Sequence, residues 1–192
     1  MASVTGGLLL LASAVRYALA SAGPVTPPML SRPTPCTEWD LEALLDHVSD
    51  SAGVLHQVIT AGCAGPAPPP GDGRPGLDPV RGLHRQTSRL LAACAAGPAG
   101  QLVAIGDREL TTNMVALAGA LEITVHGWDI SAACGPRQPV PRGLAAILLP
   151  LAPLLITPAT RPGLFADPVP VPAQADLGDQ LVAFLGRQPR AP

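Results

Sequence analysis

The distribution of proline is the feature that most restricts how this chain can fold. Of its 192 residues, 24 are proline and 20 are glycine. Proline inside a helix removes a hydrogen bond and clashes with the preceding turn, so the proline-rich stretches at 24–36 and 65–76 are predicted to be irregular. The second stretch, GPAPPPGDGRPG, is predicted to be an exposed linker. Regular structure is therefore confined to the segments between these breaks.

Those segments carry apolar residues at helical spacing. Helices are predicted over residues 8–20, 78–96 and 111–134, and over the stretch that follows a capping box formed by Thr37 and Asp40. The apolar positions of this second helix are Leu41, Leu44, Leu45, Val48, Ala52, Leu55 and Ile59. The predicted apolar face of the 111–134 helix consists of Met114, Leu117, Ala118, Leu121, Val125 and Trp128. Shorter helices are predicted over 141–155 and 179–185, with some strand character at 102–105.

The order of these elements predicts the fold class. Four long helices without α/β alternation favour an all-α fold, a four-helix bundle with a short irregular C-terminal extension. We expect a single domain over residues 1–192, in which residues 157–192 form an extended tail with a short terminal helix. Trp39 and Trp128 are expected to be core residues or walls of a binding cavity.

Composition and charge exclude several classes of function. All twelve cationic residues are arginine, so a Schiff base or a general base on lysine is excluded. The net charge is −2 and the arginines are scattered, so we expect no nucleic-acid partner. Four cysteines without a CxxC pair exclude a zinc ribbon and indicate a reduced, cytoplasmic setting. Residues 1–20 lack the positive start of a signal peptide and are too short and interrupted to span a bilayer, so we expect no membrane partner.

The stretch GALEITVHGWDI at 119–130 carries the main chemical signal. Glu122, His126 and Asp129 follow one another by one helical turn at one edge of the apolar face. The sequence has no arginine between Arg108 and Arg137, so a carboxylate turned toward the bundle would have no counter-charge on its own helix. Burying an unpaired carboxylate costs several kcal/mol, and a divalent cation removes that cost.

A second helix supplies a further ligand. His47 lies at the border of the second helix's apolar stripe and is predicted to face Glu122 and His126. Two histidines and one carboxylate with an open fourth position are typical of catalytic zinc sites. Asp129 is predicted to accept a hydrogen bond from a ligand histidine rather than to bind the metal.

Alternative interpretations remain open at this point. Glu122 and His126 would also fit a simple hydrogen-bonded pair near the surface. His56 and His84 are predicted to be surface residues outside the site. Cys36 follows a proline turn, where it is either reactive or, as is more common, a buried inert thiol.

Together these motifs resemble a known family. SRPTPCTEWDLEALLDHV at 31–48, GALEITVHGWDI at 119–130 and FADPVPVPAQADLGDQLVAFLGRQP at 165–189 resemble the actinobacterial DinB-like proteins of the mycothiol-dependent maleylpyruvate isomerase N-terminal superfamily. The resemblance implies a DinB-like four-helix bundle. It also implies that His47, Glu122 and His126 are metal ligands, and that the N-terminal apolar run is the first helix of the bundle.

The functional prediction combines the residues with this resemblance. We expect a metal-dependent transferase or isomerase with zinc as the metal, a small-molecule substrate and a low-molecular-weight thiol such as mycothiol as cosubstrate. Arg85, Arg89 and Arg108 are the arginines considered for binding an anionic thiol. The alternatives are a thiol-independent metal enzyme of secondary metabolism, such as a hydrolase, lyase or cyclase, and a non-catalytic metal-binding or small-molecule-binding protein. A homodimer is left open.

Overall fold

A computed structural model describes residues 6–37, 39–63, 78–97, 100–106, 108–135 and 137–189. The predicted all-α fold is confirmed, and the predicted linker at 65–76 lies outside the described residues. The main elements, in chain order, are α1 (Gly6–Ala22), α2 (Leu41–Ala61), α3 (Pro79–Ala96), β1 (Leu102–Ile105), β2 (Arg108–Thr111), α4 (Thr112–Cys134), α5 (Arg142–Leu155) and α6 (Leu177–Phe184). A short 3-10 helix, Pro27–Met29, interrupts the first proline-rich stretch.

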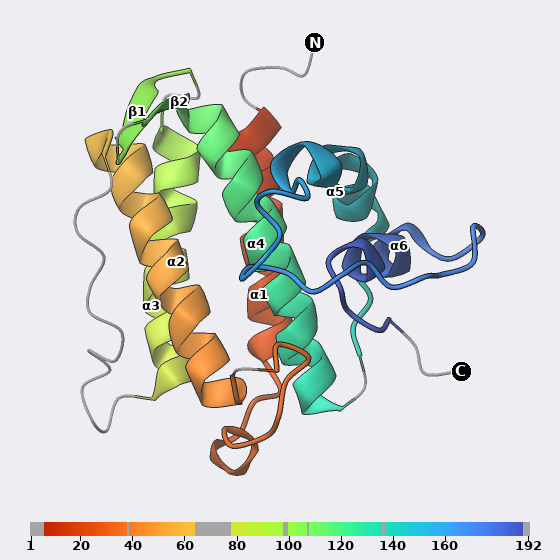
Figure 1. The fold of residues 1–192 in the computed structure, drawn as a ribbon. Coiled ribbons are helices and arrows are strands. Elements are labelled where there is room, and N and C mark those ends of the chain that lie inside the picture. The colour runs from red at the N-terminus through yellow and green to blue at the C-terminus, as the bar shows by residue number, and fades with distance from the viewer. Residues whose placement is uncertain are drawn as a thin grey trace.

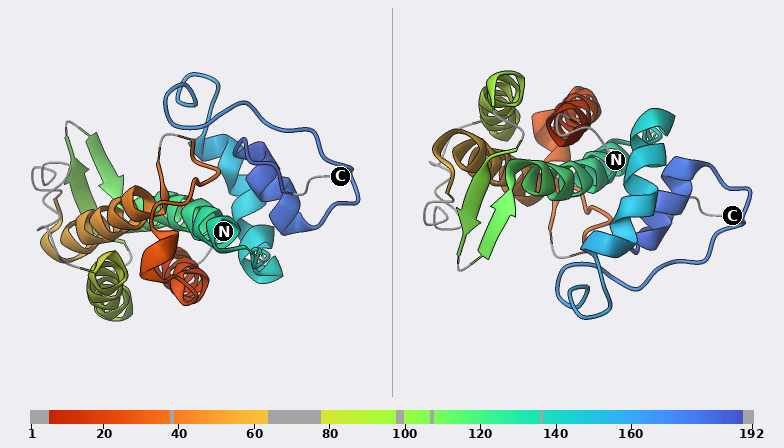
Figure 2. Two further views of the ribbon diagram at one scale, coloured as in Figure 1. Left: turned by 90° about the horizontal axis from the view of Figure 1, so that it is seen from below. Right: turned by 90° about the horizontal axis from the view of Figure 1, so that it is seen from above.

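The four long helices form the bundle. α1 packs along α4 and α2 along α3, while contacts of α1 with α3 and of α2 with α4 complete it (Figure 1). Views along the bundle place α5 and α6 on the side of α4 that faces away from α3 (Figure 2). α4 is thus the central helix, and it contacts both the bundle and the C-terminal extension.

The helix starts follow from local side-chain chemistry. Asp40 is the N-cap of α2, and its carboxylate accepts a hydrogen bond from the Ala43 backbone amide. The predicted capping box therefore has its second residue, Asp40, as the actual N-cap, and Thr37 lies before the helix. The seven apolar positions predicted for α2 are all buried.

The predicted apolar face of α4 is wrong at its N-terminal end. Met114 is 50% exposed and Ala118 is also exposed, whereas Leu121, Val125 and Trp128 are buried. From Gly119 to Ser131 every residue except Glu122 is buried. Because helices pack on several sides of this part of α4, it has no single apolar face for a periodic pattern to reveal.

The remaining elements are small. β1 and β2 form an antiparallel hairpin, of which only the first strand had a sequence signal. The chain after α5 follows turns and extended backbone to α6, as predicted for the tail. None of the described helices combines the length and apolar character that crossing a membrane requires.

Candidate metal centre

Two helices bring three potential metal ligands together. His47 comes from the second turn of α2, and Glu122 and His126 lie one turn apart in the middle of α4. Their ligand atoms all lie within 4.8 Å of one another. The structure thus places together the three residues that the sequence selected.

Glu122 is half-buried and has two hydrogen-bonding side chains near one of its oxygens. Ser51 Oγ donates a 2.6 Å hydrogen bond to Oε1, and Nε2 of His47 lies 3.2 Å from the same atom. Burial raises the pKa of Glu122, but the hydrogen bonds with His47 and Ser51 and the charges of His126 and His47 outweigh it. The pKa of Glu122 is therefore held below its ordinary value of 4.5, and the carboxylate is ionised at neutral pH.

On the side away from the cavity, His126 contacts the buried ion pair of Asp129 and Arg187. Its Nδ1 lies 3.2 Å from Oδ2 of Asp129, which is completely buried. Arg187 donates two hydrogen bonds to the same carboxylate, from Nη2 to Oδ2 at 2.8 Å and from Nε to Oδ1 at 3.2 Å. With Nδ1 facing the carboxylate of Asp129, His126 keeps Nε2 as the nitrogen available to a metal ion.

Two glycines make this arrangement possible. A Cβ on Gly127 would lie 3.0 Å from Cα of Ala18, so glycine lets α1 and α4 approach closely beside His126. Gly186 has a φ of 81°, and a Cβ there would lie 2.7 Å from the Ala166 carbonyl oxygen. The chain can therefore turn after α6 and direct Arg187 toward Asp129.

The donor set fits a divalent transition metal. Tetrahedral ligands at about 2.0–2.2 Å from zinc lie about 3.3–3.6 Å apart, close to the 3.2 Å between His47 and Glu122. Asp129 and Arg187 neutralise each other, whereas Glu122 has no cationic partner other than histidine among the described residues. Two neutral imidazoles and one carboxylate then carry one surplus negative charge, which suits a divalent ion.

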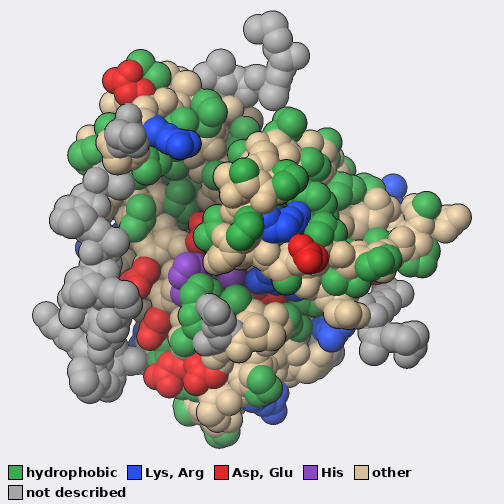
Figure 3. Space-filling view, in the orientation of Figure 1, with side chains coloured by type: hydrophobic (Ala, Val, Ile, Leu, Met, Phe, Trp, Pro, Cys, Tyr) green, Lys and Arg blue, Asp and Glu red, His purple; other side chains and the backbone are tan. Residues whose placement is uncertain are grey.

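The three residues open into a cavity of about 390 Å³. Trp39 forms one wall, its ring 4.3 Å from that of His47 and 5.8 Å from that of His126, centroid to centroid. The other walls are mainly apolar and come from the end of α5 and the chain after it, including Leu155, Ile156, Leu164 and Phe165. In the space-filling view, histidine side chains are visible in a hollow near the middle of the face shown (Figure 3).

Other predicted residues lie elsewhere or take other roles. His56 and His84 do not belong to the ligand cluster, and Arg85, Arg89 and Arg108 do not line the cavity. The expectation that one of these arginines meets a ligand in this cavity therefore finds no support. Cys36 lines the cavity and is half-buried, so it is not the buried thiol that the sequence favoured. Trp39 is a cavity wall and Trp128 a core residue, as predicted.

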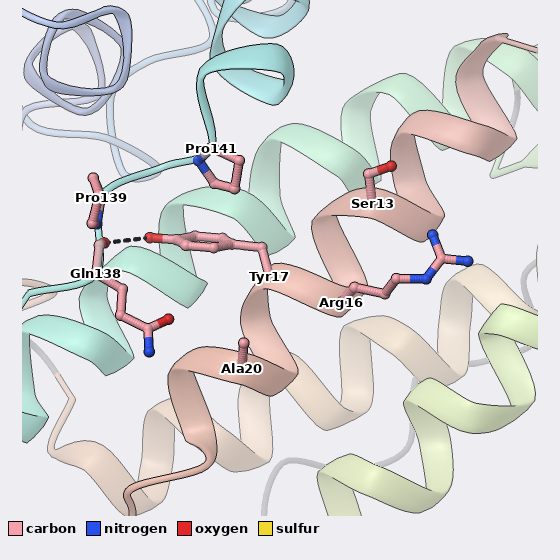
Figure 4. A pocket seen from close by; sticks show the side chains of 7 residues that line it. All are labelled: Ser13, Arg16, Tyr17, Ala20, Gln138, Pro139 and Pro141. Carbon is pink, nitrogen blue, oxygen red and sulfur yellow. Dashed lines mark hydrogen bonds between the residues drawn. The ribbon is translucent and has the colours of Figure 1, made fainter.

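A separate cavity of about 490 Å³ lies between α1 and the connection from α4 to α5 (Figure 4). Tyr17 donates a 2.9 Å hydrogen bond to the Gln138 carbonyl oxygen and so ties this connection to α1. Burial raises the pKa of Tyr17, and the charge of Asp129 adds to the increase. Among the described residues that line this cavity there is no histidine, cysteine or carboxylate, so they offer no second set of metal ligands.

Sequence reasoning missed two residues of the metal centre. Ser51 lies one turn after His47 on the same side of α2, and this spacing was a usable signal. Arg187 lies 58 residues beyond Asp129 and had only an indirect signal. A buried aspartate on a helix without a cation requires a partner from another part of the chain.

Comparisons with known proteins identify the family of the chain. Residues 11–131 match the family described as the mycothiol maleylpyruvate isomerase N-terminal domain, and this range contains His47, Glu122, His126 and Asp129. Two uncharacterized proteins of Mycobacterium tuberculosis, from strains CDC 1551 and H37Rv, are each 31% identical over 165 residues. Each alignment covers 84% of this chain and 86% of the relative. No solved structure matches the chain.

Proposed function

The chain belongs to the mycothiol maleylpyruvate isomerase N-terminal domain family, and from this we propose that it is a zinc-dependent enzyme that uses a low-molecular-weight thiol. The reaction is a transfer or isomerisation of a small molecule, with mycothiol as the thiol that the family name suggests. The observation that carries the proposal is the cluster of His47, Glu122 and His126 at an apolar cavity.

The charge of the site supports a thiolate as the fourth ligand. The ligand set carries one negative charge, so with a divalent ion the centre has one positive charge left. A bound divalent ion lowers the pKa of a thiol and so supplies a nucleophilic thiolate at neutral pH. The apolar side chains in the walls lower the polarity beside this position, which strengthens the attraction between the site and an anionic sulfur.

Each residue has a defined part in this proposal. His47, Glu122 and His126 hold the metal, while Asp129 accepts the Nδ1 proton of His126 in a hydrogen bond and fixes its tautomer. Arg187 holds the carboxylate of Asp129 in position through two hydrogen bonds. Trp39 restricts His47 by ring contact and closes one side of the cavity to water. Asp129 and Arg187 are thus positioning residues.

The lining of the cavity favours a second candidate function. The described residues that line it include no arginine, although anionic or strongly polar cosubstrates usually meet such groups. A thiol-independent lyase, cyclase or hydrolase that acts on an apolar small molecule fits this lining. The same three ligands would hold the metal in both cases.

Cobalt substitution separates the two candidates. Sulfur bound to cobalt gives intense charge-transfer absorption that an oxygen ligand does not give. Because Cys36 lines the cavity, the experiment uses the Cys36→Ser variant, so that a new sulfur band must come from added mycothiol. The proposal predicts this band, together with consumption of an electrophile only when thiol is present. Turnover without thiol and without a sulfur band would overturn it in favour of the second candidate.

A further inference from the structure

A third cavity, beside the metal cavity, contains a buried cation that forms no ion pair with any residue the structure describes. Arg161 lies in the chain between α5 and α6 and is only 9% exposed. It lines a cleft of about 800 Å³, whose remaining lining is mostly proline and phenylalanine. We propose that this cleft is a binding site for an apolar carboxylate, with Arg161 as the group that binds the anion.

The hydrogen bonds of Arg161 leave most of its donors unused. Nη1 donates a 2.7 Å hydrogen bond to the Ala166 carbonyl oxygen, and the guanidinium carbon lies 4.8 Å from the ring centroid of Phe184. A guanidinium has five N–H donors in a planar fork. Within the part of the chain that the structure describes, Arg161 forms no ion pair and no second side-chain hydrogen bond. Its remaining donors are therefore available to a ligand in the cleft.

A comparison with Arg187 supports this interpretation. Both arginines are almost completely buried, and each lies near a phenylalanine ring. Arg187, however, donates two hydrogen bonds to the carboxylate of Asp129. The hydrogen bond that the guanidinium of Arg161 forms with a described residue goes to the backbone carbonyl of Ala166. Because burying an uncompensated charge is costly, a carboxylate from a ligand would give Arg161 the partner that Arg187 already has.

The surroundings define the kind of ligand. Two phenylalanines, Phe165 and Phe184, and several prolines present apolar surface around the guanidinium, which suits an aryl or alkyl chain. Asp167 also lines the cleft, but it is exposed and forms no ion pair with Arg161. Its charge opposes an incoming anion, so we expect it to weaken binding without preventing it. The cleft shares Ile156 and Phe165 with the metal cavity, and these two residues form the boundary between the sites.

The sequence allows a direct test, because Phe165 and Phe184 are the only two phenylalanines in the chain. Protein labelled with fluorinated phenylalanine gives two fluorine NMR signals. Phe184 lines the Arg161 cleft but not the metal cavity, whereas Phe165 lines both. Benzoate is titrated into the full-length protein, both zinc-loaded and after dialysis against EDTA, and benzamide serves as the uncharged control. We expect saturable shifts of both signals with benzoate in both preparations and much weaker binding of benzamide.

Substitutions then identify the anion-binding group. Arg161→Gln should weaken benzoate binding about tenfold or more, since a charge-assisted hydrogen-bonded pair is lost. Arg142→Gln, at the exposed start of α5, should not change it, and Asp167→Asn should strengthen it about twofold. If Arg161→Gln folds poorly, Arg161→Lys provides the test, and binding severalfold weaker than in the parent is expected because lysine lacks the planar fork.

Three results would overturn the proposal. The first is unchanged affinity in the Arg161 variants, and the second is equal binding of benzamide. The third is a shift of Phe165 alone that disappears after EDTA treatment, which would place benzoate at the metal instead. None of these results depends on whether the protein uses a thiol, so the outcome is independent of the proposed enzymatic function.

Discussion

The two acidic residues in the central part of α4 lie two turns apart and have opposite environments. Asp129 is completely buried, and Arg187 neutralises it through two hydrogen bonds. The side chain of Glu122 is 38% exposed, and among the described residues its polar contacts are the Ser51 hydroxyl and the rings of His47 and His126. Asp129 faces the C-terminal extension, whereas Glu122 faces the cavity between α2 and the chain that follows α5.

The two carboxylates therefore differ in how their negative charge is balanced. Arg187 supplies the counter-charge of the inaccessible Asp129. The negative charge of Glu122, which lines the cavity, has no arginine partner among the described residues. His126 lies between the two carboxylates, with one nitrogen facing Asp129 and the other available to the cavity. The buried pair therefore determines which face of His126 a metal would meet.

The largest effect is expected from the three cavity-facing ligands. We predict that wild-type protein binds about one divalent metal ion per chain, as a three-ligand site with an open position requires. His47→Ala, Glu122→Ala and His126→Ala should each reduce this to almost none, because two remaining ligands do not hold the ion. Elemental analysis of protein purified without chelator and dialysed against trace zinc measures the stoichiometry.

Two histidines outside the cluster provide the matched control. His56 and His84 lie on α2 and α3, and neither belongs to the group of three. His56→Ala and His84→Ala should keep the full metal content. A wild-type stoichiometry in His126→Ala would instead show that the metal lies elsewhere.

The next largest effect concerns the buried pair. Arg187→Met leaves Asp129 buried without its cation, which should cost about 3–5 kcal/mol of unfolding free energy. The double variant Asp129→Asn/Arg187→Met removes both charges and should recover a substantial part of this loss. Urea denaturation of metal-free protein at neutral pH measures each free energy. If the single and double variants were equally destabilised, the pair would not be coupled and the contrast with Glu122 would fail.

The difference between the two carboxylates also explains what the sequence could predict. The helices of the bundle and the closeness of Glu122 and His126 follow from periodic spacing within single helices, and the same spacing placed His47 at the border of the apolar stripe of α2. That spacing is a local property, so the pattern is visible without tertiary information. The buried face of α4 was only partly predictable, because a helix surrounded by others loses the periodic contrast between polar and apolar sides.

Residues supplied by distant segments could not be placed from the sequence. Arg187 reaches Asp129 only because Gly186 allows a turn with positive φ after α6. The cavity walls after α5 belong to irregular backbone, for which spacing rules give no register. Cys36 was predicted to be either reactive or, as is more common, a buried inert thiol. Its position in the cavity depends on the backbone hydrogen bonds that join Leu30 and Arg32 to the start of α2.

A smaller effect on metal affinity is expected from changes at Asp129, which contacts the metal-facing residue His126. Asp129→Asn keeps the size of the side chain but removes the charge that orients His126 and favours protonation of Nδ1. Metal affinity should fall about 10–100-fold, the usual range for partners of metal-bound histidines. Competition with a chromophoric chelator measures the dissociation constant. Because Asp129→Asn also leaves Arg187 without a carboxylate, the double variant Asp129→Asn/Arg187→Met is measured in parallel, and it should show a similar loss of affinity if the effect acts through His126.

The smallest effect is expected at Ser51, which donates to Glu122. Ser51→Ala should raise the pKa of Glu122 toward its ordinary value of 4.5, because one hydrogen bond that lowers it is removed. A lowered pKa in the folded protein stabilises it above the pKa of the unfolded chain, and this contribution is lost as the pH falls through the folded pKa. In metal-free protein, Ser51→Ala should therefore cost about 0.5–1 kcal/mol at neutral pH, a small value because water partly screens Glu122.

That cost should shrink as the solution is acidified below the pKa of Glu122, because a protonated carboxyl gains little from the Ser51 hydroxyl. Ser88→Ala on α3 is the matched control, since this exposed serine donates only to a backbone carbonyl within its own helix. Urea denaturation across the acidic range compares the two variants. A cost for Ser51→Ala that stays constant with pH would mean that the hydroxyl contributes through packing, and that the charge of Glu122 is held by the histidines alone.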